Sequence, residues 1–275
     1  MPLIGFPKVA LCRYDEVCKG KETLEQIVLR AIAQGMTAIG FSARSRISFI
    51  QTHGVNPEEE ACYREEIARL KQKYGDKIRI FCGIEQDAYS DSMTQGYDFV
   101  IGAVNYVCVG DAYCSVYERP HLLRRMIERQ FASDTHAFLR TYFDALVSLA
   151  DGRECNVVAG FDASFRWSRE YALFDSRDIR YKKLLLEALD ALIEKNVVFQ
   201  INTGSFLEDV RASSRLYLMV LRHLAEQRGR VMLVSDVLGN TDPRRDLETA
   251  ARLCRSVGIG AGCYPTPDGW CSTFL

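Results

Sequence analysis

The feature that most constrains this 275-residue chain is a series of short runs that are hydrophobic without interruption and end in polar residues. The runs cover residues 8–12, 37–42, 78–85, 98–105, 156–162, 197–202 and 231–236. Strands that are buried on both faces show this continuous pattern, whereas strands with one solvent-exposed face alternate hydrophobic and polar residues. The sequence therefore predicts a parallel sheet that is covered by helices.

Longer stretches with helical periodicity separate most of these runs. Thr23 and Gln26 fit a capping box ahead of apolar residues, and Asn56 with Pro57 fits the start of a second helix that Gly75 ends. Apolar stripes at 184–192 and 216–224 predict two more helices. Strands and helices therefore alternate along the chain.

The strand–helix units follow one another without a Pro/Gly/Ser-rich linker, which favours one α/β domain over residues 1–275. Seven such units predict one closed (β/α)7 barrel, with a doubly wound open sheet as the alternative. The segment 260–275 contains Pro265, Pro267 and Gly269, and we interpret it as an irregular C-terminal tail.

Composition excludes several classes of protein. Hydrophobic residues make up 48% of the chain, and 35 basic residues nearly balance 36 acidic ones, so no net field favours nucleic acid or an anionic membrane. No apolar run reaches the roughly 18 residues of a membrane span, and the N-terminus lacks the pattern of a secretory signal. The ten cysteines contain no C-x-x-C pair, so we expect free thiols in a cytoplasmic protein.

Polar residues at the strand ends form the candidate site, because the carboxyl ends of barrel strands line the active-site mouth. They are Cys12, Tyr14, Ser42, Arg44, Glu85, Asn105, Asp162, Asn202, Ser235 and Asp236.

Several segments resemble the histidinol-phosphatase branch of the polymerase-and-histidinol-phosphatase (PHP) superfamily, in the family's order and spacing. They are AIAQGMTAIGFS (31–42), EEIARLKQKYGDKIRIFCGIEQD (65–87), YDFVIGAVNYV (97–107), GFDASF (160–165), FQINTG (199–204) and VSD (234–236). The resemblance implies a distorted seven-stranded barrel and hydrolysis of a phosphate monoester in histidine biosynthesis. It also implies a cluster of two or three zinc, iron or manganese ions.

The family's metal ligands are mostly replaced in this chain. Glu85 and Asp236 keep the family's residue type, and Asp162 of its GHFD motif also remains. The family histidines and one aspartate correspond here to Cys12, Tyr14, Lys19, Arg44, Asn105, Gly160 and Leu238. Arginine, glycine and leucine offer no metal ligand, so the family's metal site cannot be assembled and we expect no bound cofactor.

The four histidines do not repair this loss. His121, His136 and His223 fall in predicted helices, and only His53, after the second strand, lies in a loop that could reach the mouth. If a metal is bound, we expect Cys12, Glu85 and Asp236 to hold it, and a thiolate site of Cys12 and Cys18 with Glu85 is an alternative. A buried Cys12 without metal is the simpler interpretation.

Arg44 is the most informative replacement. We expect its guanidinium to lie in the barrel mouth and to pair with Glu85, Asp236 or both, because buried carboxylates without a metal need another partner.

Basic residues also suggest how an anion could be held. Arg44, Arg166, Arg169 and Arg211 are candidate anion-binding residues, whereas Gln200 and Glu208 depart from the family pattern. A solvated basic surface is the alternative interpretation.

These observations leave three hypotheses for function. The first is a catalytically inactive PHP relative that binds a small anionic ligand or a protein partner. The second is a metal-dependent histidinol-phosphate phosphatase with a remodelled site built on Cys12, Glu85, Asn105 and Asp236. The third is an interaction barrel with no pocket.

The first hypothesis predicts that protein purified without chelator carries no stoichiometric zinc, iron or manganese, because only Glu85 and Asp236 remain of the metal ligands. Elemental analysis by mass spectrometry measures this directly. One or more tightly held metal ions per chain would instead support the remodelled phosphatase.

Overall fold

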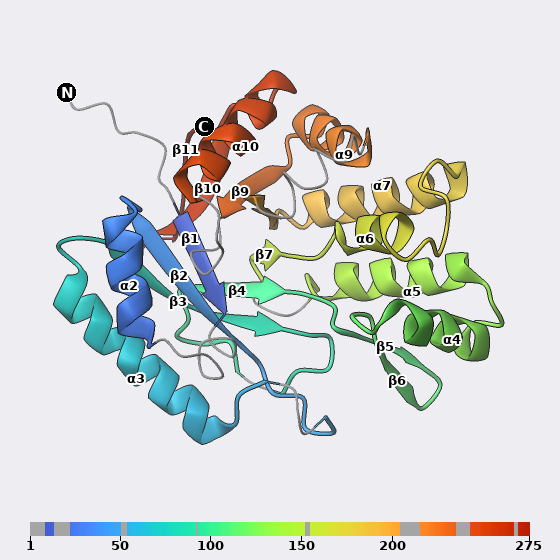
Figure 1. The fold of residues 1–275 in the computed structure, drawn as a ribbon, viewed down its shortest axis with the longest axis horizontal. Helices are drawn as coiled ribbons and strands as arrows, with labels where there is room; N and C mark the ends of the chain where they lie inside the picture. The colour runs from blue at the N-terminus through green and yellow to red at the C-terminus, as the bar shows by residue number, and fades with distance from the viewer. Residues whose placement is uncertain are drawn as a thin grey trace.

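The computed structural model describes residues 9–13, 23–50, 54–91, 93–151, 155–203, 215–234, 243–266 and 269–275, with only the backbone for 9–13, 215 and 243–245. Its centre is a parallel sheet in the order β1-β2-β3-β4-β7-β8-β9 (Figure 1). These strands are β1 (Val9–Arg13), β2 (Ala38–Arg44), β3 (Arg79–Gln86), β4 (Phe99–Gly102), β7 (Val157–Val158), β8 (Val198–Asn202) and β9 (Arg230–Val234).

The strand order identifies the fold as a curled, barrel-like sheet. Each strand adds on the same side of the one before it, so the order never reverses as it must in a doubly wound sheet. The two end strands, β1 and β9, also contact each other. The barrel prediction is therefore confirmed, and the doubly wound alternative is wrong.

Helices cover the outside of this sheet (Figure 1). They are α2 (Leu24–Ala33), α3 (Pro57–Tyr74), α4 (Pro120–Gln130), α5 (Thr135–Ser148), α6 (Ala163–Arg169), α7 (Ile179–Glu194), α9 (Arg215–Glu226) and α10 (Pro243–Ser256). The predicted capping box of Thr23 is present before α2, and Asn56 starts α3 as predicted, where Glu59 completes a second capping box. In the described part of the chain, no helix is long and apolar enough to cross a membrane.

Two apolar layers hold the sheet between its helices and its interior. Outward side chains such as Ile39, Phe41 and Phe199 pack under the helices in the larger cluster. Inward side chains such as Phe81 and Met232 form a smaller cluster inside the barrel. Burial on both faces is the physical reason that the strands are continuously hydrophobic.

The prediction of an irregular C-terminal tail at residues 260–275 is wrong. They form a β-hairpin of β10 (Ala261–Thr266) and β11 (Gly269–Phe274). Cys263 joins the cluster inside the barrel, and the guanidinium of Arg230 lies 5.7 Å from the ring of Trp270. The hairpin therefore covers the amino-terminal end of the sheet, and this tertiary packing stabilises strands despite the nearby prolines.

A second hairpin follows β4 and was not predicted. It consists of β5 (Tyr106–Val109) and β6 (Ala112–Ser115), which pair antiparallel. The fifth parallel strand is also shorter than the predicted 156–162, because Gly160 has a φ of +80° that cannot continue a strand. Each of the apolar runs at 98–105 and 156–162 thus contains a short strand followed by the first residues of the next loop.

Candidate ligand site at the mouth of the barrel

The register of β2 and β3 brings the first two site residues together. Arg44 and Glu85 are direct partners across this parallel pair. Phe41 and Ala43 face the helix layer, so the alternation of side chains along β2 turns Arg44 toward the inside of the barrel. Both residues lie at the carboxyl ends of their strands, where barrel sites form.

The expected pairing of Arg44 with Glu85 is confirmed. Arg44 Nε lies 3.4 Å from Glu85 Oε1, and the two side chains are 27% and 10% exposed. The geometry is that of an ion pair rather than a well-aligned hydrogen bond. The other expected partner, Asp236, lies outside the described residues.

Asn105 completes a small cluster around the same carboxylate. Its Nδ2 donates a hydrogen bond to Glu85 Oε1 at 3.3 Å, and the residue is buried. Its backbone oxygen accepts from the N–H of Val116, which ties it to the end of the β5–β6 hairpin. One oxygen of Glu85 therefore faces both a cationic side chain and an amide donor.

Asp87 is a site residue that the sequence analysis missed. Its carboxylate accepts hydrogen bonds from the backbone N–H groups of Asn105 at 2.6 Å, Tyr106 at 3.3 Å and Tyr89 at 3.1 Å. Burial raises the pKa of Asp87 to about 6, although these hydrogen bonds oppose the shift. The signal was present in GIEQD, because Asp87 follows Glu85 by two residues and so faces the same side.

Gly160, where the resemblance implies a family histidine, has a backbone conformation that suits glycine. Its φ of +80° disfavours any side chain, and an added Cβ would lie 3.1 Å from the hydroxyl oxygen of Tyr142. That hydroxyl donates a 2.6 Å hydrogen bond to the Gly160 carbonyl. Two residues later, Asp162 accepts a hydrogen bond from the Tyr217 hydroxyl at 2.9 Å, and burial raises its pKa.

Besides Arg44, two other described anion-binding candidates lie on α6. Arg166 Nε and Arg169 Nη2 both bond to the carboxylate of Glu170, at 2.9 and 2.7 Å. The Arg166 guanidinium also lies 5.2 Å from the ring centre of Tyr171. Much of their charge is therefore balanced within the helix.

Among the remaining candidates, Ser42 is buried in β2 and Asn202 ends β8, whereas the others are partly or wholly undescribed. Cys12 is placed in β1 by its backbone, in register with Phe41, and nothing further is described of it. Tyr14, Lys19, Arg211, Asp236 and Leu238 lie outside the described residues, as do Cys18 and His53.

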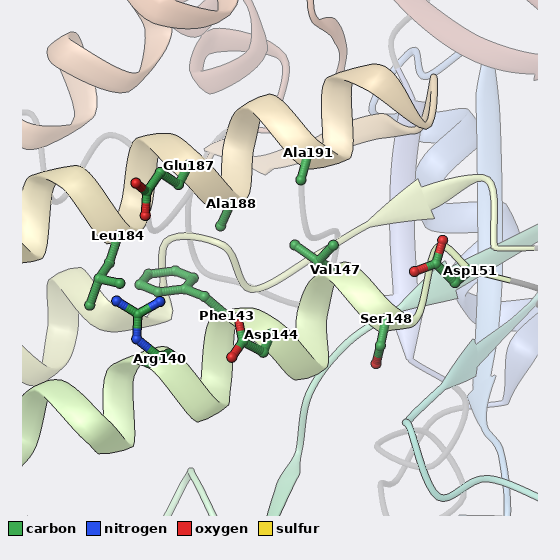
Figure 2. A pocket seen from close by; sticks show the side chains of 10 residues that line it. All are labelled: Arg140, Phe143, Asp144, Val147, Ser148, Asp151, Leu184, Glu187, Ala188 and Ala191. Carbon is green, nitrogen blue, oxygen red and sulfur yellow. The ribbon is translucent and has the colours of Figure 1, made fainter.

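A separate hollow of about 230 Å³ lies between α5 and α7. Figure 2 shows Phe143, Val147, Leu184 and Ala188 along it, with Arg140 extending toward Glu187. This groove belongs to the outer helix layer and contains none of the predicted site residues. The candidate site is therefore the cluster of Arg44, Glu85, Asp87 and Asn105.

The Arg44–Glu85 pair leads to a prediction about stability. Arg44→Ala should lower the free energy of unfolding by about 1–3 kcal/mol, between the values typical of exposed and buried pairs, because Arg44 is 27% exposed. Adding Glu85→Gln should recover part of this loss, since it removes the orphaned charge. Urea denaturation measures both effects, with exposed Arg46→Ala as a control that should stay within about 0.5 kcal/mol of the parent. An unchanged midpoint for Arg44→Ala would contradict the pairing.

Asp87 leads to a prediction about pH. Its pKa is raised from 3.8 to about 6 on folding, so the protonated form contributes stability that is lost as pH rises from about 4 to about 6. The stability difference between the parent and Asp87→Asn should change over this window by about 2–3 kcal/mol, to the disadvantage of the parent at higher pH. Urea midpoints at several pH values test this. The control is Asp175→Asn, because Arg177 lowers the pKa of Asp175 and no loss with rising pH is expected there. A pH-independent difference at Asp87 would refute the assignment.

Comparison with known proteins agrees with this fold. The chain is 22% identical to a Schizosaccharomyces pombe protein named "Probable histidinol-phosphatase", over 90% of this chain and 85% of the relative. A Lactococcus lactis histidinol phosphate phosphatase, crystallised with zinc, L-histidinol and phosphate, superposes with a TM-score of 0.70 at 19% identity, covering 96% and 99% of the two chains. A Listeria monocytogenes structure described as a histidinol phosphatase gives 0.62 at 10% identity, covering 87% and 98%.

The family match spans most of the strands that build the mouth. The PHP domain family matches residues 15–204, from the segment after β1 to the end of β8. The match thus contains Arg44, Glu85, Asp87, Asn105 and Gly160. This chain belongs to the PHP domain family, and its sheet is the barrel of the family's histidinol-phosphatase relatives.

Proposed function

We propose that this chain is a PHP barrel that binds a small phosphorylated ligand at the mouth of the barrel without hydrolysing it. The observation that carries the proposal is the environment of Glu85. Its Oε1 contacts the Arg44 guanidinium at 3.4 Å and the Asn105 amide nitrogen at 3.3 Å. Neither of these groups is a metal ligand, and the guanidinium repels a cation.

The described residues of the mouth do not fit the multinuclear metal centre that the resemblance implies. Across the described ranges, no group of three or more His, Cys, Asp or Glu side chains is arranged to hold a metal ion. Glu85 is engaged by Arg44 and Asn105, and Asp87 by three backbone N–H groups. At position 160 the backbone conformation disfavours the family's histidine.

Loss of the metals removes the means of hydrolysis. Metal ions in such sites lower the pKa of bound water from about 15.7 toward 7, which supplies hydroxide at neutral pH. In the described mouth, Asp87 is the carboxyl group with a pKa near 6, but its oxygens are occupied by backbone hydrogen bonds. No other described group of the cluster replaces a metal-activated water.

Arg44 gives the mouth a group that suits a phosphate. Its guanidinium is permanently charged, planar and partly exposed, and such groups recognise phosphate oxygens well. The Lactococcus relative was crystallised with L-histidinol and phosphate. Because the two chains share the barrel, we propose the phosphate ester of a small amino alcohol, such as histidinol phosphate, as the ligand class.

Two other functions make different predictions. A metal-dependent phosphatase with a remodelled site would need Cys12, Glu85, Asn105 and Asp236 to coordinate a metal and would release phosphate. A barrel used only for interaction would bind no small ligand. Release of phosphate would distinguish the remodelled phosphatase from our proposal. Binding of a small ligand would distinguish our proposal from the interaction barrel.

Histidinol phosphate should bind to the parent in titration calorimetry with chelator present, because the proposed site does not need a metal. Arg44→Ala should weaken binding at least tenfold, the loss expected for a charge-assisted hydrogen bond. Arg177→Ala is the matched control, since Arg177 is 86% exposed and pairs with Asp175. No phosphate should be released, even with added zinc or manganese. Turnover that co-purifies with the protein and disappears in Glu85→Ala would establish the remodelled phosphatase, and absence of binding would leave the interaction barrel.

A further inference from the structure

Three aromatic side chains gather at the surface, where the segments that follow β2, β3 and β4 meet. Phe49 is 48% exposed, and its ring centre lies 4.0 Å from that of Tyr113, which is 44% exposed. The ring centre of Tyr89 lies 5.0 Å from that of Tyr113 and 6.2 Å from that of Phe49. Exposed apolar side chains that contact one another in this way are typical of binding surfaces, whereas single exposed ones are not.

The loop that carries Phe49 is anchored at the candidate site. It leaves β2 directly after Arg44, and it returns where the backbone N–H of Val55 donates a 3.0 Å hydrogen bond to the Arg44 carbonyl. Within the loop, the backbone N–H of Ser48 donates a 2.6 Å hydrogen bond to the carboxylate of Asp91 in the loop after β3. Phe49 therefore lies in a loop that starts and closes at Arg44, the residue that we propose for phosphate binding.

The β5–β6 hairpin carries a further aromatic side chain on the same surface. Residues directly opposite each other in an antiparallel pair share a face, as do residues two positions apart along a strand. Cys108 pairs with Tyr113, so Tyr106 and Tyr113 lie on one face of the hairpin. The other face, which includes the buried Val107, packs against the core. In Figure 1, the loop after β2 and this hairpin lie on the same side of the sheet.

Tyr106 connects these rings to the candidate site. Its backbone N–H donates to the Asp87 carboxylate at 3.3 Å. Burial raises the pKa of Tyr106, the Asp87 carboxylate adds to this rise, and the Arg44 guanidinium opposes it. The Tyr106 side chain therefore lies within electrostatic reach of both charged groups, and an aromatic surface leads outward from Arg44. We call this surface the aromatic wall, and it consists of Phe49, Tyr89, Tyr106 and Tyr113.

We propose that the aromatic wall binds a planar aromatic or heteroaromatic ring of the same ligand whose phosphate group contacts Arg44. This inference rests on the proposed function and narrows its ligand class to phosphate esters that carry a ring. The planes of Phe49 and Tyr113 are tilted by 34°, and a third ring can extend this pair, because aromatic rings attract one another in offset and edge-to-face arrangements. An aliphatic group would be buried against the wall without gaining this ring geometry. Small-molecule sites commonly combine such a surface with a few polar groups that fix the orientation of the ligand.

Two ligands that differ in the ring test the wall by titration calorimetry with chelator present. Histidinol phosphate carries an imidazole ring, whereas O-phosphoethanolamine has a phosphate and an amine but no ring. The parent should bind histidinol phosphate about three- to tenfold more tightly, the range expected for one aromatic contact. Combining Phe49→Leu with Tyr113→Leu should remove most of this preference and leave the affinity for O-phosphoethanolamine unchanged, because leucine is apolar but has no ring. Phe49→Trp should keep the preference. Phe274→Leu is the matched control, since Phe274 is 87% exposed on β11 and should affect neither ligand.

Proton NMR of the ligand adds a readout that a general change in structure would not imitate. The imidazole protons of histidinol phosphate should shift upfield on binding to the parent, because they lie over an aromatic ring, and this shift should be lost when Phe49→Leu and Tyr113→Leu are combined. Arg44→Ala should weaken the binding of both ligands. Binding that depends on Arg44 but shows no preference for histidinol phosphate would overturn this inference alone, and so would equal losses for the two ligands in the leucine variant. Absence of binding of either ligand would overturn it together with the proposed function. Metal-dependent release of phosphate would overturn the proposed function alone, since binding in chelator still measures the ring preference.

Discussion

The parallel pairing of β2 with β3 is the constraint on which the candidate site depends. It places Arg44 directly opposite Glu85, at the end of two strands buried on both faces. Strands buried in this way leave their side chains few directions in which to move, so the guanidinium and the carboxylate meet at the mouth. Asn105 reaches the same oxygen because Asp87, two residues beyond Glu85, holds the backbone that follows β4. Sheet register and one buried carboxylate together position the whole cluster.

In our proposal that the family's metal site has been lost, this arrangement explains how Glu85 is accommodated without a metal. A buried carboxylate without partners costs several kcal/mol, and a metal normally compensates that cost. For Glu85, the Arg44 guanidinium and the Asn105 amide compensate this cost. Gly160 has a left-handed backbone, and an added Cβ would lie 3.1 Å from the Tyr142 hydroxyl oxygen, so the histidine that the resemblance implies at this position would be disfavoured. On this account, the mouth has been rebuilt around hydrogen bonds and one ion pair.

Much of the fold could be predicted from the sequence because burial on both faces leaves a continuous apolar signal. Each predicted strand is present, and the predicted helix starts at Thr23 and Asn56 both form. The two hairpins escaped prediction for opposite reasons. Tyr106–Ser115 continues an apolar run that was assigned to one strand, whereas Pro265 and Gly269 gave 260–275 the composition of a loop. The pairing of Arg44 with Glu85 followed from charge and strand position. For Asp87, the sequence offered its place two residues after Glu85, but not the backbone N–H groups that it binds.

A phosphorus NMR spectrum of histidinol phosphate with an equimolar amount of the protein, with and without zinc, tests the central claim most directly. It reports binding and hydrolysis in the same sample. The account predicts that the ester resonance shifts or broadens, that the effect is much smaller with Arg44→Ala, and that no inorganic phosphate resonance appears over many hours. An inorganic phosphate resonance that grows with time and depends on Glu85 would contradict it, and so would an ester resonance that the protein leaves unchanged.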